Sequence, residues 1–484
     1  MSMPSAIQMC LIVRATEIWK KRYAANSFVH ADLDPVFKKF NETVSESIGF
    51  VEVVDLPSQW QFAGEDPAPN AVVPSELDRL VVTIVLRIDP DADPVMVERL
   101  LTRTLPSFLI ENLDGFDAEP AAFAQVGIDL PIRSGTHWCP GTGGQLLFGT
   151  RSDAGALIGK PYLHGAGIDL RGRDVNVVVI DQGVHKDSIP TNFAGGWTEG
   201  KHAPGTGAIR GHGTMVARNI LDIAPQARIF DCPLIPQSVS GLPPQIENLP
   251  AFLGSAFAAW LEILLTIAGY KATGRFPGPW ILVNAWALYD RSIEFPRGAY
   301  TNNRNHFFNW AVKLSHDLDL DVVFCAGNCG LFCPDMRCGQ NDQGPRQSIL
   351  GANSLDQVLT VGAVRNDATW LGYSSQGPGQ PELGSTKPDL CAPTQFSEDL
   401  DGYLGNIGTS AAAAMAAGVV AALREAWDSN LVPPDVLKQI LVDTARKTQG
   451  TAWNGQIGHG IIDAHAAYCA LDGLVPAPKR TAGY

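Results

Sequence analysis

From residue 151 onward, the chain alternates between short uninterrupted apolar runs and longer stretches with helical periodicity. An uninterrupted apolar run is typical of a strand whose two faces are both covered, as in a parallel sheet. Strands that alternate with helices predict a doubly wound α/β domain, with helices on both faces of a mostly parallel sheet. The predicted strands are 175–180, 228–234, 280–284, 321–326 and 357–364, and the predicted helices are 213–223, 250–272, 305–318, 410–427 and 433–444.

Residues 1–150 have a different pattern, which predicts an N-terminal α+β region. Two runs rich in Val and Ile, 48–56 and 80–88, are predicted strands, and 94–105 has helical spacing with Pro94 at its start. The stretch 65–74 is a predicted loop. The domain prediction is therefore an α+β region over 1–150, an α/β domain over 151–474 and a short tail over 475–484.

Composition narrows the class of partner. The formal net charge is −14, and a strongly acidic chain without a basic block is a poor candidate for binding nucleic acid or anionic lipid. One apolar stretch, 249–270, is long enough to cross a membrane, but Glu262 lies inside it. We therefore predict a buried helix there, with a membrane-embedded protein as the alternative.

The N-terminus and the cysteines predict a cytoplasmic location. The first basic residue, Arg14, follows a short apolar run, whereas an export signal begins with positive charge. The chain has nine cysteines, an odd number, and a secreted disulfide framework usually uses all of its cysteines.

Three short motifs carry residues that are used in nucleophilic catalysis. Asp181 ends an apolar run in VVVIDQGV, His212 lies between glycines in GHGTMVARNI, and Ser410 begins a predicted helix in GTSAAAAMAAGVVAAL. Active sites of open α/β sheets gather at the carboxyl ends of strands, and a helix N-terminus favours negative charge. Each motif also has an ordinary explanation, as a turn aspartate, a histidine near a helix start and a helix cap.

Together the motifs resemble the subtilase family of serine peptidases, because Asp, His and Ser occur in that family's order. The resemblance covers roughly residues 150 to 470. A fourth motif, VVFCAGNCG, holds Asn328 where the family has an asparagine whose amide binds the oxyanion. The resemblance implies a serine endopeptidase acting on protein or peptide substrates. A catalytically silent member used as a peptide-binding scaffold is the alternative.

The resemblance also implies a role for each residue. Ser410 would be the nucleophile, His212 its general base and Asp181 the group that orients the imidazole. Asn328 would stabilise the oxyanion. The chain departs from the family at Gln182, where Ser or Thr is usual, and at Ala414, where Pro is usual. In the substrate-binding strand that follows Asn284, Leu288 stands where the family has Gly, and this predicts a narrowed or reshaped specificity pocket.

Four cysteines surround Asn328, namely Cys325, Cys329, Cys333 and Cys338. Three interpretations remain open: disulfides that hold the oxyanion loop, a zinc or redox-sensing site, and unpaired structural thiols. No cofactor is predicted with certainty. The family often holds structural calcium, and the sequence has no contiguous acidic loop of the required spacing, so calcium is left open.

The N-terminal region has two interpretations. Many subtilases carry a small α+β propeptide that assists folding and inhibits the site until it is cleaved, and the pattern over 48–105 is compatible with one. Such a region would inhibit the enzyme within the same molecule. A permanent regulatory or recognition domain is the alternative.

Overall fold

A computed structural model shows how the chain folds. It describes residues 5–15, 30–44, 48–55, 60–63, 80–112, 116–117, 125–134, 147–165, 167–200, 202–236, 251–292, 294–398, 405–448 and 452–477. The predicted loop over 65–74 lies outside these residues, as does most of the predicted tail.

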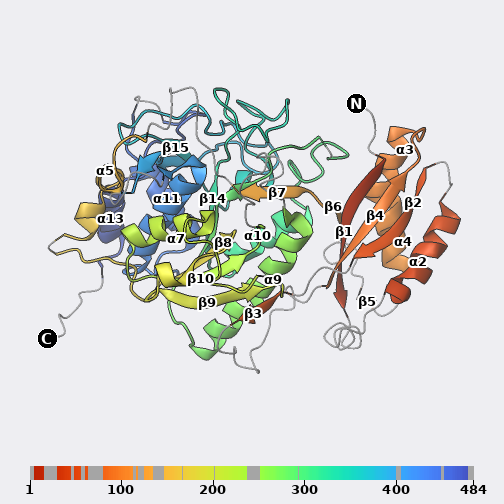
Figure 1. The fold of residues 1–484 in the computed structure, drawn as a ribbon, viewed down its shortest axis with the longest axis horizontal. Coiled ribbons are helices and arrows are strands. Elements are labelled where there is room, and N and C mark those ends of the chain that lie inside the picture. The colour runs from red at the N-terminus through yellow and green to blue at the C-terminus, as the bar shows by residue number, and fades with distance from the viewer. Residues whose placement is uncertain are drawn as a thin grey trace.

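An eight-stranded sheet forms the centre of the larger part of the molecule (Figure 1). Its strand order is β16-β15-β14-β12-β8-β10-β9-β3, and every neighbouring pair is parallel except β3 with β9. The strands are β3 Gln61–Ala63, β8 Asn176–Asp181, β9 Phe193–Thr198, β10 Arg228–Pro233, β12 Trp280–Asn284, β14 Asp321–Cys325, β15 Leu359–Val364 and β16 Leu390–Pro393.

Helices cover both faces of this sheet. Successive residues of a strand point to opposite faces, so one strand can pack against helices on both sides. In β8, Val177 and Val179 pack into a cluster with α7, α11, α12 and α13, whereas Val178 and Ile180 pack into a second cluster with α9 and α10. The doubly wound α/β prediction is confirmed. The helices are α5 Arg151–Leu157, α6 Lys160–Leu163, α7 His212–Ile223, α9 Leu253–Thr273, α10 Phe307–Asp317, α11 Gly408–Arg424, α12 Pro434–Thr444 and α13 Ala464–Leu474.

A second sheet lies at the other end of the molecule, on the right in Figure 1. Its strand order is β2-β4-β1-β5, and β6 also pairs with β1. The elements of this part are β1 Ala6–Ala15, α2 His30–Thr43, β2 Gly49–Asp55, β4 Leu80–Ile88, α3 Pro94–Arg99, a π-helical turn Leu100–Thr104, α4 Leu105–Asn112, β5 Phe116–Asp117 and β6 Gln125–Ile128. The apolar run before Arg14 is therefore part of a sheet strand, β1, which sequence reasoning did not assign.

Two short strands from residues 1–150 pair with the larger part of the molecule. β3 extends the edge of the eight-stranded sheet, and β7 (Pro131–Ser134) lies between β11 (Ala251–Phe252) and β13 (Trp286–Ala287) in a three-stranded sheet. Figure 1 shows β7 reaching from the N-terminal sheet onto the larger part. The boundary predicted at residue 150 remains a prediction, but the pairing of β3 and β7 crosses it.

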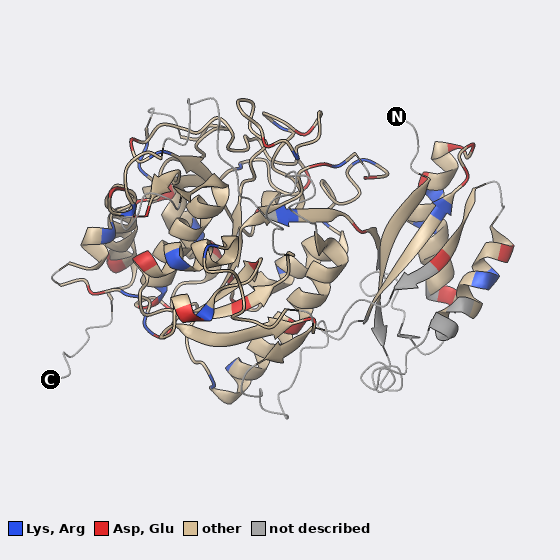
Figure 2. Ribbon diagram, viewed as in Figure 1, with Lys and Arg blue, Asp and Glu red and all other residues tan. Residues whose placement is uncertain are grey.

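The long apolar helix α9 covers one face of the main sheet. By length and composition alone it could cross a membrane, yet 72% of its most apolar window is buried inside the protein, as in the core helix of a soluble domain. Burial raises the pKa of Glu262 on this helix to about 7. Figure 2 shows acidic and basic residues interspersed over the outer helices and loops, so the acidic net charge is spread out.

Candidate active site

Asp181 and His212 come together at the carboxyl end of β8. Asp181 is the last residue of that strand and His212 is the first residue of α7. The imidazole Nδ1 lies 2.6 Å from Asp181 Oδ1, and both side chains are buried. Because Nδ1 donates to the carboxylate, the neutral ring presents Nε2 as an acceptor. His212 Nε2 has no hydrogen-bond partner among the described residues.

Glycines allow the two elements to approach this closely. Gly183 leaves β8 with a φ of +99°, which favours glycine, and a Cβ on Gly213 would lie 2.5 Å from the Gly183 carbonyl oxygen. Thr214 on α7 links the loop after β8 to the loop before α7. Its hydroxyl accepts from the His185 amide and donates to the Ala208 carbonyl. The exit of β8 and the start of α7 therefore form one packed unit.

Ser410 lies in the first turn of α11, fully buried. Its Oγ donates to the Ala285 carbonyl at 3.0 Å, so Ser410 sits beside the residue that links β12 to β13. Gly418 on α11 allows close packing against α7, since a Cβ there would lie 2.9 Å from the Ile220 carbonyl oxygen. The helices that carry His212 and Ser410 are thus neighbours. Within the described part of the chain, no hydrogen bond joins Ser410 Oγ to His212 Nε2.

Asn328 follows β14, and its side chain is held from both ends. Its Oδ1 accepts from the amide and the hydroxyl of Thr409, at 3.0 and 2.9 Å. Its Nδ2 donates to the Tyr289 hydroxyl at 3.2 Å. Because Thr409 directly precedes Ser410, this contact ties the orientation of the amide to the first turn of α11. Burial raises the pKa of the Tyr289 hydroxyl well above its usual range, so the phenol is neutral.

The cysteines around Asn328 are mostly oxidised. Cys329 and Cys338 form a disulfide, Cys333 is also disulfide-bonded, and Cys325 is a buried free thiol. The Cys329–Cys338 disulfide therefore closes the loop that follows Asn328, and zinc binding at these cysteines stays a prediction. Disulfides are typical of oxidising compartments. The cytoplasmic location rests on the sequence alone and stays a prediction.

Metal binding also stays a prediction. Across the described ranges, no three His, Cys, Asp or Glu side chains form a group suited to holding a metal ion.

Sequence reasoning missed Asp231, a buried carboxyl in β10, next to β8. Its Oδ2 accepts from the backbone amides of Val184 and Gly205, at 3.0 and 2.8 Å, and so fixes the loop that follows Asp181. Burial raises the pKa of Asp231 from 3.8 to about 7, and the nearby charge of Asp181 adds to the increase, while the two amides oppose it. An aspartate inside the apolar run RIFDCPL is the signal that could have found it.

Replacing Asp231 with Asn is expected to change how stability depends on pH. Between pH 4 and 7 the carboxyl is ionised in the unfolded chain and protonated in the folded one. The folded state therefore binds more protons, and stability falls as pH rises through this window. Asn keeps an acceptor for both amides and does not titrate. In a Ser410→Ala background, which prevents self-digestion, the parent should lose about 3 kcal/mol more than the Asn variant from pH 4 to 7, measured by urea unfolding. If the unfolding free energies of the parent and the Asn variant change equally with pH, the raised pKa of Asp231 would be contradicted.

The comparisons with known proteins identify the family. The model of the subtilase family matches residues 172–460, which is more than half of the chain. The chain belongs to the subtilase family. It is therefore a serine-type endopeptidase, a hydrolase that acts on protein or peptide substrates. The match contains all four predicted residues, Asp181, His212, Asn328 and Ser410. No match was found among curated protein sequences.

The solved structures that are similar to this subtilase include the following three. A lanthipeptide protease is 18% identical, with a TM-score of 0.45, over 65% of this chain and 94% of the other. MycP1 from the ESX-1 type VII secretion system is 18% identical, with a TM-score of 0.44, over 73% and 93%. Fervidolysin from Fervidobacterium pennivorans, a keratinolytic enzyme related to subtilisin, is 15% identical with a TM-score of 0.50, over 98% of this chain and 62% of that one. The fervidolysin likeness supports the fold.

Proposed function

We propose that this subtilase cleaves peptide bonds through an acyl-enzyme on Ser410, with His212 as general base and Asp181 as the orienting carboxylate. The contact of 2.6 Å between His212 Nδ1 and Asp181 Oδ1 is the observation that carries the proposal. It fixes the tautomer that leaves Nε2 ready to accept a proton, and it stabilises the imidazolium that forms. Apolar residues of similar volume often stabilise a protein as well as a buried charged pair does. The presence of this pair at the end of β8 therefore supports a role in function.

In the proposed reaction, the Ser410 hydroxyl would turn from the Ala285 carbonyl toward His212 Nε2. Its Oγ now donates to the Ala285 carbonyl, and catalytic hydrogen bonds are often long or unformed until substrate binds. Attack would place negative charge on the substrate carbonyl oxygen. Asn328 Nδ2 and the Ser410 amide at the start of α11 would then stabilise that charge.

We also propose that β7 occupies the substrate cleft and that the N-terminal region thereby inhibits the enzyme. β7 pairs antiparallel with β13, the strand that the family resemblance assigns to substrate binding, with Arg133 opposite Ala287 and Ser134 opposite Trp286. The next residue back along the enzyme strand is Ala285, whose carbonyl accepts from Ser410. β7 therefore leads the chain toward the nucleophile, as a bound substrate would. This arrangement favours a propeptide-like role over a separate recognition domain.

A fluorophosphonate probe tests the function directly. It phosphonylates only a serine that an adjacent base activates. We expect mass spectrometry to find the probe on Ser410 in the full chain, and no labelling in the Ser410→Ala variant. Ser292→Ala, which removes an exposed serine, is the matched control and should label like the parent.

A second variant distinguishes an active site that is blocked by β7 from a chain that has no catalytic activity. Ile132 is fully buried in β7, so Ile132→Asp should loosen this strand from its place between β11 and β13. Labelling should become at least about tenfold faster. If neither the parent nor Ile132→Asp labels at Ser410, the chain is a silent scaffold and the proposed function is wrong.

A further inference from the structure

Side chains on β13 and just after it alternate between two environments. Trp286 and Leu288 pack into the core cluster that includes α9 and α10, whereas Ala287 and Tyr289 pack with Cys329 and Cys338. The sequence drew attention to Leu288 as the residue that would reshape the specificity pocket. The structure instead places Tyr289, one residue later, beside Asn328.

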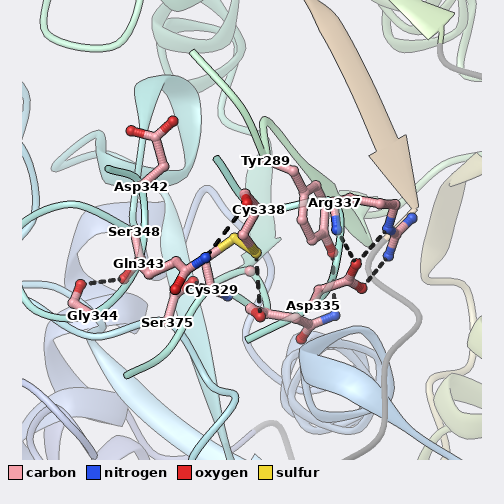
Figure 3. The surroundings of a disulfide bond; sticks show 12 residues. Tyr289, Cys329, Asp335, Arg337, Cys338, Asp342, Gln343, Gly344, Ser348 and Ser375 are labelled. Carbon is pink, nitrogen blue, oxygen red and sulfur yellow. Dashed lines mark hydrogen bonds and ion pairs between the residues drawn. A yellow bond between two sulfur atoms is a disulfide. The ribbon is translucent and has the colours of Figure 1, made fainter. Parts of the chain in front are cut away.

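Tyr289 is fixed at this position from several directions. Its hydroxyl accepts from Asn328 Nδ2 at 3.2 Å, and its carbonyl accepts from the Gly339 amide at 2.9 Å. The Arg337 guanidinium lies over its ring, 4.4 Å from the ring centre, as Figure 3 shows. Only 2% of the residue is exposed, so the ring is packed closely against its neighbours.

The loop that holds Arg337 is tied down by hydrogen bonds and a disulfide. Arg337 donates to the Asp335 carboxylate through Nε, at 2.8 Å, and through a terminal nitrogen, at 2.6 Å. The Asp335 amide donates to the Asn328 carbonyl at 3.0 Å. The Cys329–Cys338 disulfide closes the loop and packs against Tyr289 (Figure 3). Moving Tyr289 aside would therefore disturb a cation–π contact, an ion pair and a cross-linked loop together.

The proposed reaction places a substrate side chain in this space. A carbonyl carbon within reach of Ser410 Oγ, with its oxygen near Asn328 Nδ2, puts the side chain of the same residue beside both groups. That residue, which precedes the scissile bond, would meet the ring of Tyr289. We propose that Tyr289, backed by the disulfide and by Arg337, closes this pocket, so that the enzyme takes substrates with Gly, Ala or Ser before the scissile bond. This inference rests on the proposed function.

The chain's own sequence agrees with this substrate class. β7 leads toward Ser410, and its last residue, Ser134, is small. The proposed self-inhibiting segment therefore carries the residue type that the filled pocket predicts.

A panel of four peptides tests the proposal on the full chain, with and without Ile132→Asp. Each peptide is Pro-Ile-Arg-Xaa-Xaa-Thr between a fluorophore and a quencher, with Ala or Leu at each Xaa, and product masses identify the residue before each cut. We expect every cut to follow Ala, with kcat/KM at least about 100-fold above that for any cut after Leu. The Leu-Leu peptide should resist cleavage.

Two variants of Tyr289 separate its volume from its hydroxyl. Tyr289→Ala should open the pocket and raise the Leu-to-Ala ratio at least about tenfold. Tyr289→Phe keeps the volume, so it should keep the Ala preference while turnover falls, because Asn328 loses its partner. If Tyr289→Ala does not fold, the parent and Tyr289→Phe still decide the question.

The outcomes distinguish the two proposals. Cuts after Leu at rates equal to those after Ala would overturn the pocket inference and leave the proposed function intact. The same holds if the fluorophosphonate labels Ser410 while no Ala-containing peptide is cut. Absence of labelling in both the parent and Ile132→Asp would overturn the proposed function itself.

Discussion

Replacing either Ser410 or His212 with alanine should lower kcat by about 10⁶-fold, and replacing both should lower it no further. The magnitude is carried over from subtilisin. The two groups act as one unit, because Ser410 is a poor nucleophile until His212 takes its proton, and a base without a nucleophile has nothing to activate. Turnover of an Ala-containing peptide by each single variant and by the double variant is the measurement.

Asp181→Asn belongs to the same series, with an expected loss of about 10⁴-fold. It preserves the shape of the pair but removes the acceptor that selects the Nδ1–H tautomer. His202→Ala, which removes an exposed histidine, should turn over substrate like the parent. Losses that multiply in the double variant would show that Ser410 and His212 act independently, and the triad would then be wrong.

The central sheet was predictable because its signal is local. Four central strands are apolar runs covered on both sides, so β8, β10, β12 and β14 begin and end within about two residues of the prediction. β9 and β16 were not predicted. The family motifs then placed Asp181 and His212 on the ends of neighbouring elements, where the structure has them in contact.

Short strands with distant partners were not predictable. β3 has three residues and β7 has four, and their partners lie more than 100 residues away in the sequence for both β3–β9 and β7–β13. Runs this short carry no periodicity that separates a strand from a loop. β1 was missed for another reason, because its apolar run was weighed as an export signal and not as a strand.

The surroundings of Asn328 show a third kind of limit. The sequence indicated the cluster of cysteines but could not choose among disulfide, metal and thiol, since the choice depends on distances in space. The sequence also indicated Leu288 as the residue that reshapes the pocket, because it occupies the position along the chain where the family has Gly. Which residue contacts Asn328 depends on the alternation of side chains along β13 and the two residues after it, and that residue is Tyr289.

The position of Asn328 depends on contacts that converge from separate segments. Thr409 holds its Oδ1, Tyr289 holds its Nδ2, and the loop closed by the disulfide holds its backbone carbonyl through the Asp335 amide. A donor fixed before the reaction pays no cost of reorganisation when charge develops on the substrate oxygen. In the proposed reaction, the Asn328 amide would therefore already be held in place when charge develops on the substrate oxygen.

Asn328→Ala should therefore lower kcat by about 10²–10³-fold while KM changes little, again as for subtilisin. Asn328→Asp keeps an acceptor for Thr409 but replaces the donor with a negative charge, so its loss should be at least as large. Thr409→Val removes one contact that orients the amide and should cost less than either. Asn305→Ala, at an exposed position, is the matched control. A rise in KM at unchanged kcat would mean that Asn328 binds the ground state equally well, and its assignment as the oxyanion donor would then be wrong.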